Sequence, residues 1–243
     1  MCNTAHVRDY HQAEELMRIS IIVPALNEAD SIVSTLEGLK PFRKDDNEVI
    51  VVDGGSKDET VSLATSMVDK IIKSAPGRAQ QMNVGAKQAS GDVLWFLHAD
   101  TLVPENAIQL ILGALENQKN QWGRFDIRLS GKQPLLRLVE KLMNLRSRIT
   151  GIATGDQGIF VRREVFESVG GFTPIPLMED LDISKRLKKY SRPCCLDTKL
   201  VTSSRRWEEN GILSTIMLMW RLRLAYTLGV RPEKLVNDYK LSD

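Results

Sequence analysis

The chain has 243 residues, of which 42% are hydrophobic and 26% charged, values ordinary for a globular protein of one or two domains. Its net charge of +2 gives no field strong enough to indicate a nucleic-acid partner. The three cysteines have neither metal-site nor disulfide spacing, which favours a reducing cytoplasm. Function must therefore be sought in local sites.

Residues 1–17 lack the apolar core of a secretory signal and are predicted to form a flexible extension. Apolar runs of strand length follow, and we expect strands at 19–26, 48–54, 70–74 and 92–100. The segments between them predict helices at 28–40, from Ser56 onward with a Ser-x-x-Glu capping box, and at 77–89. Runs that are apolar on both faces are typical of parallel strands covered on both sides. The alternation therefore predicts a right-handed, doubly wound α/β half-sheet.

The second half of the chain is less regular. We expect a helix from Pro104 to about Asn117, followed by a strand at 124–129 and a helix at 134–149. The remaining predicted elements are a short helix ending at Gly170, an acid-led helix at 178–190, a strand near 194–201 and C-terminal helices from about 211. Neither a low-complexity linker nor a repeat interrupts the sequence, which predicts a single domain over 18–243.

Residues 211–229 raise the question of a membrane. Arg221 and Arg223 interrupt this apolar segment well before the roughly 18 to 20 residues that a span requires, so no transmembrane helix is expected. Two interpretations stay open. We favour a helix packed on the domain; the other is a helix lying at the inner face of a membrane, with Trp220 and Tyr226 among the headgroups.

Polar side chains gather where the predicted strands end. Pro24, Asn27 and Glu28 follow the first strand, Asp53 ends the second, and the pair His98 and Asp100 ends the fourth. Ligands of open parallel sheets bind beyond the carboxyl ends of the strands, so these residues predict a binding site. The dinucleotide fingerprint GxGxxG and the P-loop motif are both absent from the sequence, which argues against those two nucleotide-binding classes.

Several motifs resemble family 2 glycosyltransferases of the GT-A fold: PALNE at 24–28, VVDGGSKDET at 51–60, HAD at 98–100 and MED at 178–180. The similarity is greater still to a bacterial subgroup, some of whose members are named for arsenosugar biosynthesis, although nothing in these residues recognises arsenic. The subgroup motifs occur here in the same order, as GRAQQMNVGA (77–86), FLHADT (96–101), GDQGIFVRR (155–163), GGF (170–172), PLMED (176–180) and SSRRW (203–207). Six motifs in register are far more specific than any one of them.

The resemblance implies a GT-A fold, with a mostly parallel central sheet flanked by helices. It also implies inverting transfer of a sugar from a nucleotide-diphosphate donor to an acceptor hydroxyl, with Mn²⁺ or Mg²⁺ as cofactor and an unknown acceptor. Asp180 resembles the family's catalytic base, with Glu179 beside it, and Asp100 resembles the metal ligand, with His98 as a tentative second one. The residues implied at the donor are Pro24, Ala25, Asn27, Glu28, Asp53, Arg78, His98 and Arg206, and those at the acceptor side are Asp156, Gln157 and Trp207.

Structural roles compete with these assignments. Asp100 is equally suited to cap the following helix, and a histidine at a strand end is more often structural than a metal ligand. Asp53 fits a turn before two glycines. Asp180 also lies where a helix dipole favours an acid, whereas Arg78 lies at a helix start that disfavours a cation, which points to phosphate contact.

Two other functions remain as alternatives. A noncatalytic module that binds nucleotide or glycan is expected to lack Asp100 or Asp180, and both are present. A sugar-phosphate nucleotidyltransferase is expected to carry a glycine-rich loop with Arg and Lys after the first strand, and PALNE offers neither.

Overall fold

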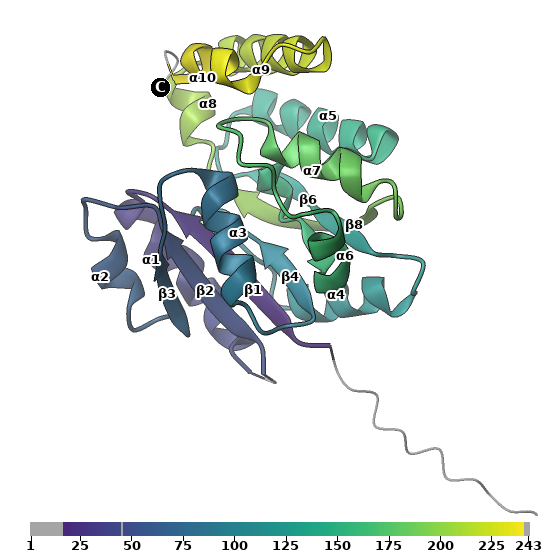
Figure 1. Ribbon diagram of the computed structural model, residues 1–243. Helices are drawn as coiled ribbons and strands as arrows, with labels where there is room; N and C mark the ends of the chain where they lie inside the picture. Colours follow the sequence, from purple (N-terminus) through teal and green to yellow (C-terminus); the bar gives the residue numbers. More distant parts are fainter. Residues whose placement is uncertain (1–16, 45, 241–243) are drawn as a thin grey trace, which may run out of the picture.

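A computed structural model describes residues 17–44 and 46–240, and in this part of the chain eight strands form one sheet (Figure 1). The strand order is β3-β2-β1-β4-β7-β6-β8-β5. The first four strands are parallel to one another, as predicted, and comprise β1 (Ile19–Ala25), β2 (Glu48–Asp53), β3 (Lys70–Lys73) and β4 (Val93–Phe96). The extension predicted for 1–17 lies outside the described residues, apart from Met17.

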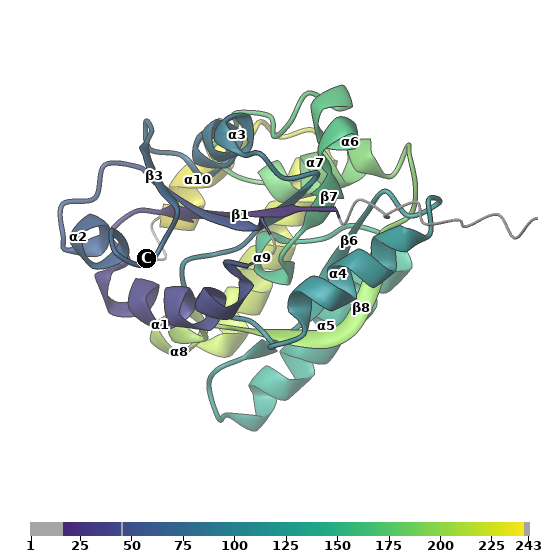
Figure 2. The ribbon, with the colours of Figure 1, turned by 90° about the horizontal axis from the view of Figure 1, so that it is seen from below.

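Two apolar cores, one on each face of the sheet, explain why these strands are hydrophobic throughout. Alternate residues point to opposite faces, so Ile21 contributes to one core and Ile22 to the other. Helices α1 (Ala29–Leu39) and α4 (Ala107–Glu116) cover the first face, and α3 (Arg78–Gln88), α6 (Arg163–Ser168) and α7 (Glu179–Leu187) cover the second. Figure 2 shows β1 edge-on between α3 and α1. Gly85 lets α3 approach closely, because a Cβ there would lie 2.5 Å from Cγ2 of Ile22.

The other half of the sheet is mixed. Strand β7 (Phe160–Arg162) is antiparallel to β4 and to β6 (Trp122–Leu129), whereas β6 is parallel to β8 (Cys194–Thr202), which pairs antiparallel with β5 (Thr101–Leu102). Helix α5 (Pro134–Thr150) packs on β6. Helices α8 (Arg205–Glu209), α9 (Ile212–Thr227) and α10 (Pro232–Lys240) follow β8 and lie beyond the strand ends (Figure 1).

Three predicted boundaries were wrong. The helix expected from Ser56 begins only at Thr60, as α2 (Thr60–Ala64), because Ser56 Oγ accepts a hydrogen bond from the Asn27 N–H instead of capping its own segment. Strand β4 ends at Phe96, so the chain has left the extended conformation before Asp100. Helix α4 begins three residues after Pro104.

Within the described residues, no helix is long and apolar enough to cross a membrane. Helix α9 instead packs on the domain, as favoured above: Leu222 is fully buried and joins a cluster with Met178 and Leu181 of the α7 region. Its other side remains exposed, and Trp220 retains 70% of its accessible surface. The structure therefore supports the packed helix and leaves an apolar face uncovered.

Candidate active site

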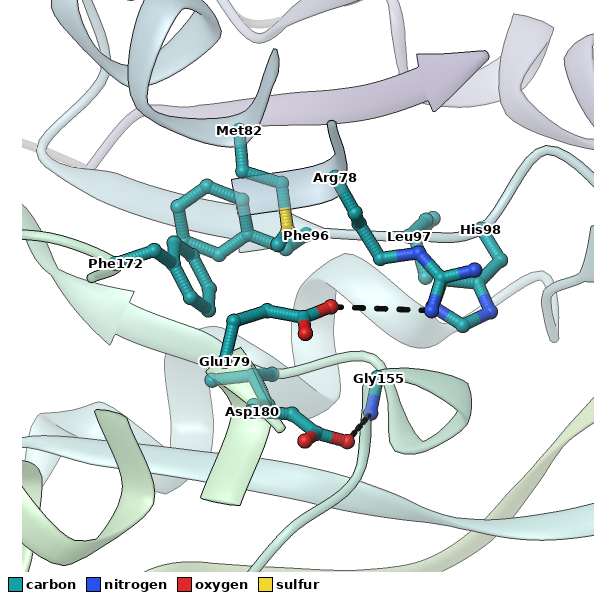
Figure 3. Close-up of a pocket in the computed structure, with 10 residues that line it drawn as sticks. Arg78, Met82, Phe96, Leu97, His98, Gly155, Phe172, Glu179 and Asp180 are labelled. Carbon is teal, nitrogen blue, oxygen red and sulfur yellow. Dashed lines mark hydrogen bonds and ion pairs between the residues drawn. The ribbon is translucent and has the colours of Figure 1, made fainter. Parts of the chain in front are cut away.

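The carboxyl ends of β1, β2 and β4 meet at one edge of the sheet because these strands are neighbours. The predicted convergence of strand ends is thereby confirmed. The end of β4 and the segment after it, together with the amino ends of α3 and α7, line a small pocket (Figure 3). Its polar lining includes Arg78, His98, Glu179 and Asp180.

The turn after β1 is attached to the loop after β2. Asn27 adopts a positive φ of 54°, and its Oδ1 accepts a hydrogen bond from the Lys57 N–H at 2.8 Å. The Glu28 N–H donates to Thr60 Oγ1 at 2.8 Å. Pro24 and Ala25 lie within β1, paired with the end of β2. These contacts fix the shape of the turn that was predicted to contact the donor.

Asp53 has the turn geometry that competed with its predicted role at the donor. It is 3% exposed, and its two carboxylate oxygens accept hydrogen bonds from the backbone N–H groups of Gly55 and Ser56 at 3.1 and 3.0 Å. A direct function at the nucleotide base therefore remains a prediction, whereas its function in the loop is visible.

Two side chains of α3 position the site and were missed by the sequence analysis. Buried Gln81 donates from Nε2 to the carbonyls of Ala25 and Val52, both at 2.8 Å, and so joins the ends of β1 and β2. Asn83 pairs with the backbone of Phe172, donating at 2.7 Å and accepting at 2.9 Å. Their only sequence signal was membership of the GRAQQMNVGA motif.

Glu179 and Arg78 lie across the pocket from each other. The carboxylate of Glu179 is buried, and its Oε1 lies 3.8 Å from Nη1 of Arg78, whose side chain is half-exposed. Burial, followed by the negative charge of Asp180, raises the pKa of Glu179, although Arg78 opposes the shift. Glu179 is therefore held toward its neutral form, while the side chain of Arg78 stays half-exposed in the pocket lining.

Asp180 lies in the first turn of α7 and is held in place by the backbone. Its Oδ2 accepts a hydrogen bond from the Gly155 N–H at 3.1 Å, and Oδ1 accepts one from the Leu181 N–H at 2.7 Å. The preceding Met178 is buried and adopts a left-handed φ of 71°, an uncommon conformation for a residue with a side chain. This turn directs the first residues of α7 toward the pocket.

Gln157 does not have the surface position expected of an acceptor contact. It is fully buried in the 3₁₀ turn Gly155–Gln157, where its Oε1 accepts from the Thr154 N–H at 3.1 Å in a capping box. Its function at the acceptor side stays a prediction, whereas the function of its amide in the turn that carries Gly155 is visible.

His98 is held between two residues of the same turn. Its Nδ1 lies 3.2 Å from Oδ1 of Asp156, and its Nε2 faces Gly155, where a Cβ would lie 2.4 Å away. Burial acts to raise the pKa of Asp156, but the hydrogen bond and charge of His98, with Arg78, outweigh it and lower the pKa. Nδ1 is thus engaged by Asp156, whereas Nε2 is buried without a hydrogen-bond partner among the described residues, so metal ligation by His98 stays a prediction.

Asp100 fits a metal ligand. Its Oδ1 is buried and has no hydrogen-bond partner among the described residues. A buried carboxylate oxygen without a donor is costly unless a cation or another ligand satisfies it, and Mg²⁺ and Mn²⁺ prefer oxygen. Nowhere in the described chain do three His, Cys, Asp or Glu side chains gather around a possible ion. A site built on Asp100 would therefore take its other ligands from substrate phosphates and water.

Arg206 and Trp207 lie on α8, near the C-terminal helices. The guanidinium of Arg206 stacks 3.5 Å from the ring centre of Tyr239 and donates to the Tyr239 carbonyl at 3.1 Å. Trp207 packs with an apolar cluster that includes Leu136 and Ile212. Trp207 also lines a groove with Asp156, on the side where acceptor contacts were predicted.

Solved structures share this arrangement of sheet and helices. TarS residues 1–349 from Staphylococcus aureus superpose with a TM-score of 0.65 at 20% identity, covering 78% of this chain and 61% of that one. The mannosyltransferase PcManGT from Pyrobaculum calidifontis, in complex with GDP-Man and Mn²⁺, gives a TM-score of 0.63 at 23% identity over 86% of this chain and 61% of its own. The protein therefore has the GT-A glycosyltransferase fold.

The sequence places the chain within a family. The profile of glycosyl transferase family 2 matches residues 20–170, more than half of the 243 residues, so the chain belongs to that family. A probable glycosyltransferase of Bacillus subtilis, YdaM, is 26% identical over 240 aligned residues, which cover 89% of this chain and 56% of the relative. An undecaprenyl-phosphate 4-deoxy-4-formamido-L-arabinose transferase of Pseudomonas fluorescens is 31% identical over 157 residues, covering 59% of this chain and 46% of its own. The chain thus spans about half the length of these curated relatives.

Proposed function

We propose that residues 18–243 form a single domain that transfers a sugar from a nucleotide-diphosphate donor to an acceptor hydroxyl by one displacement with inversion. The observation that carries this proposal is the position of Asp180, which projects from the amino end of α7 into the pocket beyond β1, β2 and β4. TarS has been solved with UDP-GlcNAc and PcManGT with GDP-Man, which supports a nucleotide-sugar donor here.

Asp180 is the proposed base that takes the proton of the acceptor hydroxyl as its oxygen attacks the anomeric carbon. The Gly155 and Leu181 N–H groups hold its carboxylate in position at 3.1 and 2.7 Å, as the geometry of a general base requires. A positioned general base typically contributes about 10² to 10⁴ in rate. Glu179 is less suited to this task, because its raised pKa favours the neutral form. Its proposed role is to orient Arg78.

The leaving diphosphate is the second requirement of the reaction. Asp100 would hold a divalent cation, which supplies Lewis-acid stabilisation of the negative charge on the diphosphate. Arg78 would add a fixed positive charge from the amino end of α3, at the same edge of the sheet. No second carboxylate is placed as a free nucleophile among the pocket-lining residues described, which favours a single displacement over a covalent intermediate.

The donor side is proposed to involve the 24–28 turn and Asp53, and the acceptor side to involve Asp156. The 24–28 turn and Asp53 are held by hydrogen bonds to the loop after β2, and Asp156 contacts His98 of the pocket. Rigid placement of donor and acceptor is itself a large part of catalysis in bimolecular reactions.

A donor screen tests this function. Binding of UDP-, GDP-, ADP- and dTDP-sugars would be measured by thermal shift and then by calorimetry, each with and without Mn²⁺. We expect one nucleotide class to stabilise the protein in a Mn²⁺-dependent way, because a ligand that binds only the folded state raises the melting temperature. Stabilisation by none of the four classes would contradict the proposed function.

A further inference from the structure

A second cavity lies between α5 and α9, on the far side of Asp156 from the pocket. Its volume is ≈290 Å³, near the lower end of the range of about 300 to 1,000 Å³ typical of ligand sites. Most of its wall is apolar and comes from α5, α9 and Trp207 of α8, with Leu142, Leu145, Ile149, Met219 and Trp220 among the lining residues.

The rim of this groove is unusually apolar for a protein surface. On α5, Leu142, Leu145 and Ile149 are 49%, 53% and 67% exposed, and on α9, Trp220 is 70% exposed. Single exposed apolar residues are common, but a set of them around one cavity is typical of a binding surface. The lining and the rim together suit a hydrocarbon chain.

Two arginines lie within this apolar wall. Nε and Nη2 of Arg146 are buried and have no hydrogen-bond partner in the part of the chain that the structure describes. Arg223 lines the same groove, and none of the described residues forms an ion pair with it. Asp156, which lines the groove, and Asp180 attract both arginines, but neither acid forms a hydrogen bond or an ion pair with them among the described residues. The two buried nitrogens of Arg146 therefore still lack an acceptor, which is unfavourable unless an added anion supplies one.

The electrostatics of the two arginines agree with this interpretation. Burial, followed by the positive charge of Arg223, lowers the pKa of Arg146 to about 10, and burial also lowers the pKa of Arg223. Both remain cationic at neutral pH. Two guanidinium forks that repel each other without a ligand can share the oxygens of one phosphate.

The groove adjoins the candidate active site through Asp156. Asp156 lines the groove and contacts His98, which lines the pocket. We propose that this groove binds a lipid with one hydrocarbon chain and a phosphate monoester head, the phosphate on Arg146 and Arg223 and the chain between α5 and α9. This inference concerns binding and goes beyond the proposed transfer reaction.

Calorimetry with farnesyl phosphate, farnesol and inorganic phosphate tests the inference on the full chain. We expect farnesyl phosphate to bind at least tenfold more tightly than either farnesol or phosphate, because only it satisfies both the arginines and the apolar wall. Arg146→Gln and Arg223→Gln should each lower the affinity for farnesyl phosphate at least tenfold. Ile149→Ser should lower the affinity for farnesyl phosphate but leave the affinity for inorganic phosphate unchanged.

Arg221→Gln is the matched control, since Arg221 lies on the same helix, is exposed and pairs with Asp238 at 2.9 Å. Equal affinities for farnesol and farnesyl phosphate would overturn the inference. A loss of farnesyl phosphate affinity in Arg221→Gln as large as in the Arg146 and Arg223 variants would also overturn it. Binding to phosphatidylglycerol vesicles that depends on Arg221 but not on Arg146 would also overturn it, in favour of a membrane surface. Nucleotide-sugar binding is measured in the same variants and should be unchanged, so failure of the donor site and failure of the lipid site give different results.

Discussion

The backbone N–H of Gly155 donates a hydrogen bond to Oδ2 of Asp180 at 3.1 Å, and His98 packs against the other side of the same glycine. One small residue thus connects the segment after β4 with the first turn of α7. The GDQG and PLMED motifs, which lie 25 residues apart at this contact, meet there. The position of the proposed base therefore depends on the absence of a side chain at residue 155.

Gly155→Ala should disturb the site without removing any functional group. A Cβ at this position would lie 2.4 Å from Nε2 of His98, and overpacking of this kind costs typically about 1 to 3 kcal/mol. We expect a lower free energy of unfolding in urea and a loss of transfer activity. The control is Gly113→Ala in α4, where a Cβ meets nothing within 4 Å and stability should be equal or higher. Adding His98→Ala should recover stability in the Gly155 variant, and failure to do so would contradict the proposed contact.

Asp100→Ala should remove the metal dependence of donor binding. The buried Oδ1 of Asp100 is the proposed protein ligand, so its loss leaves the cation with only phosphate and water oxygens. Calorimetry with the nucleotide diphosphate chosen by the donor screen should show that Mn²⁺ no longer improves affinity. Glu105→Gln removes an exposed carboxylate in the same loop and should leave the Mn²⁺ effect intact. An unchanged effect in the Asp100 variant would exclude this residue as a ligand.

The pH dependence of the stability of Glu179→Gln tests whether the pKa of Glu179 is raised. The folded-state pKa of Glu179 is raised by burial and by Asp180, so its contribution to stability is present below the unfolded pKa near 4.5 and is lost as pH rises through the folded value. Glutamine does not ionise, so the variant does not lose stability in this way. Its free energy of unfolding, compared with that of the wild type, should therefore become more favourable as the pH rises from acid to neutral. Urea unfolding at several pH values measures the difference, and a constant difference would contradict the raised pKa.

Glu48→Gln should have the opposite pH dependence. Burial acts to raise the pKa of Glu48, but hydrogen bonds from Lys70, Ser90 and Ser20 outweigh it and lower the pKa from 4.5 to about 2. The carboxylate of Glu48 therefore stabilises the folded state above pH 4.5, and this contribution, about 3 kcal/mol, is lost as the pH falls toward 2. The variant should be less stable than the wild type at neutral pH and nearly equal to it at low pH. Exposed Glu37→Gln is the control, and an equal effect there would argue against the buried network.

The alternation of strands and helices in the first half of the chain could be predicted from sequence, because each apolar run is bounded by turns and followed by a helix. Helices α1, α3 and α7 begin within a residue or two of the expected positions. The helix at Ser56 could not be placed by its capping box, because the Ser56 hydroxyl is used by Asn27, 29 residues away in sequence. A local motif does not reveal a competing partner brought near by the fold.

The candidate site shows the same limit. The family motifs singled out Asp100 and Asp180, because chain position alone favoured a helix cap at Asp100 equally. Burial was not visible in the sequence, so Gln157 was assigned to the acceptor side although it is fully enclosed. The unpartnered state of Arg146 was equally hidden, because it depends on which side chains α5 and α9 bring together.

The most direct test of the account is transfer by Asp180→Asn, measured at saturating donor and compared with Glu164→Gln, which removes an exposed acid from the first turn of α6. Asparagine keeps the size of the side chain but cannot accept the hydroxyl proton. We predict a loss of about 10² or more in kcat with donor affinity nearly unchanged in the Asp180 variant, and normal turnover in the control. Comparable turnover in the two variants would contradict Asp180 as the base.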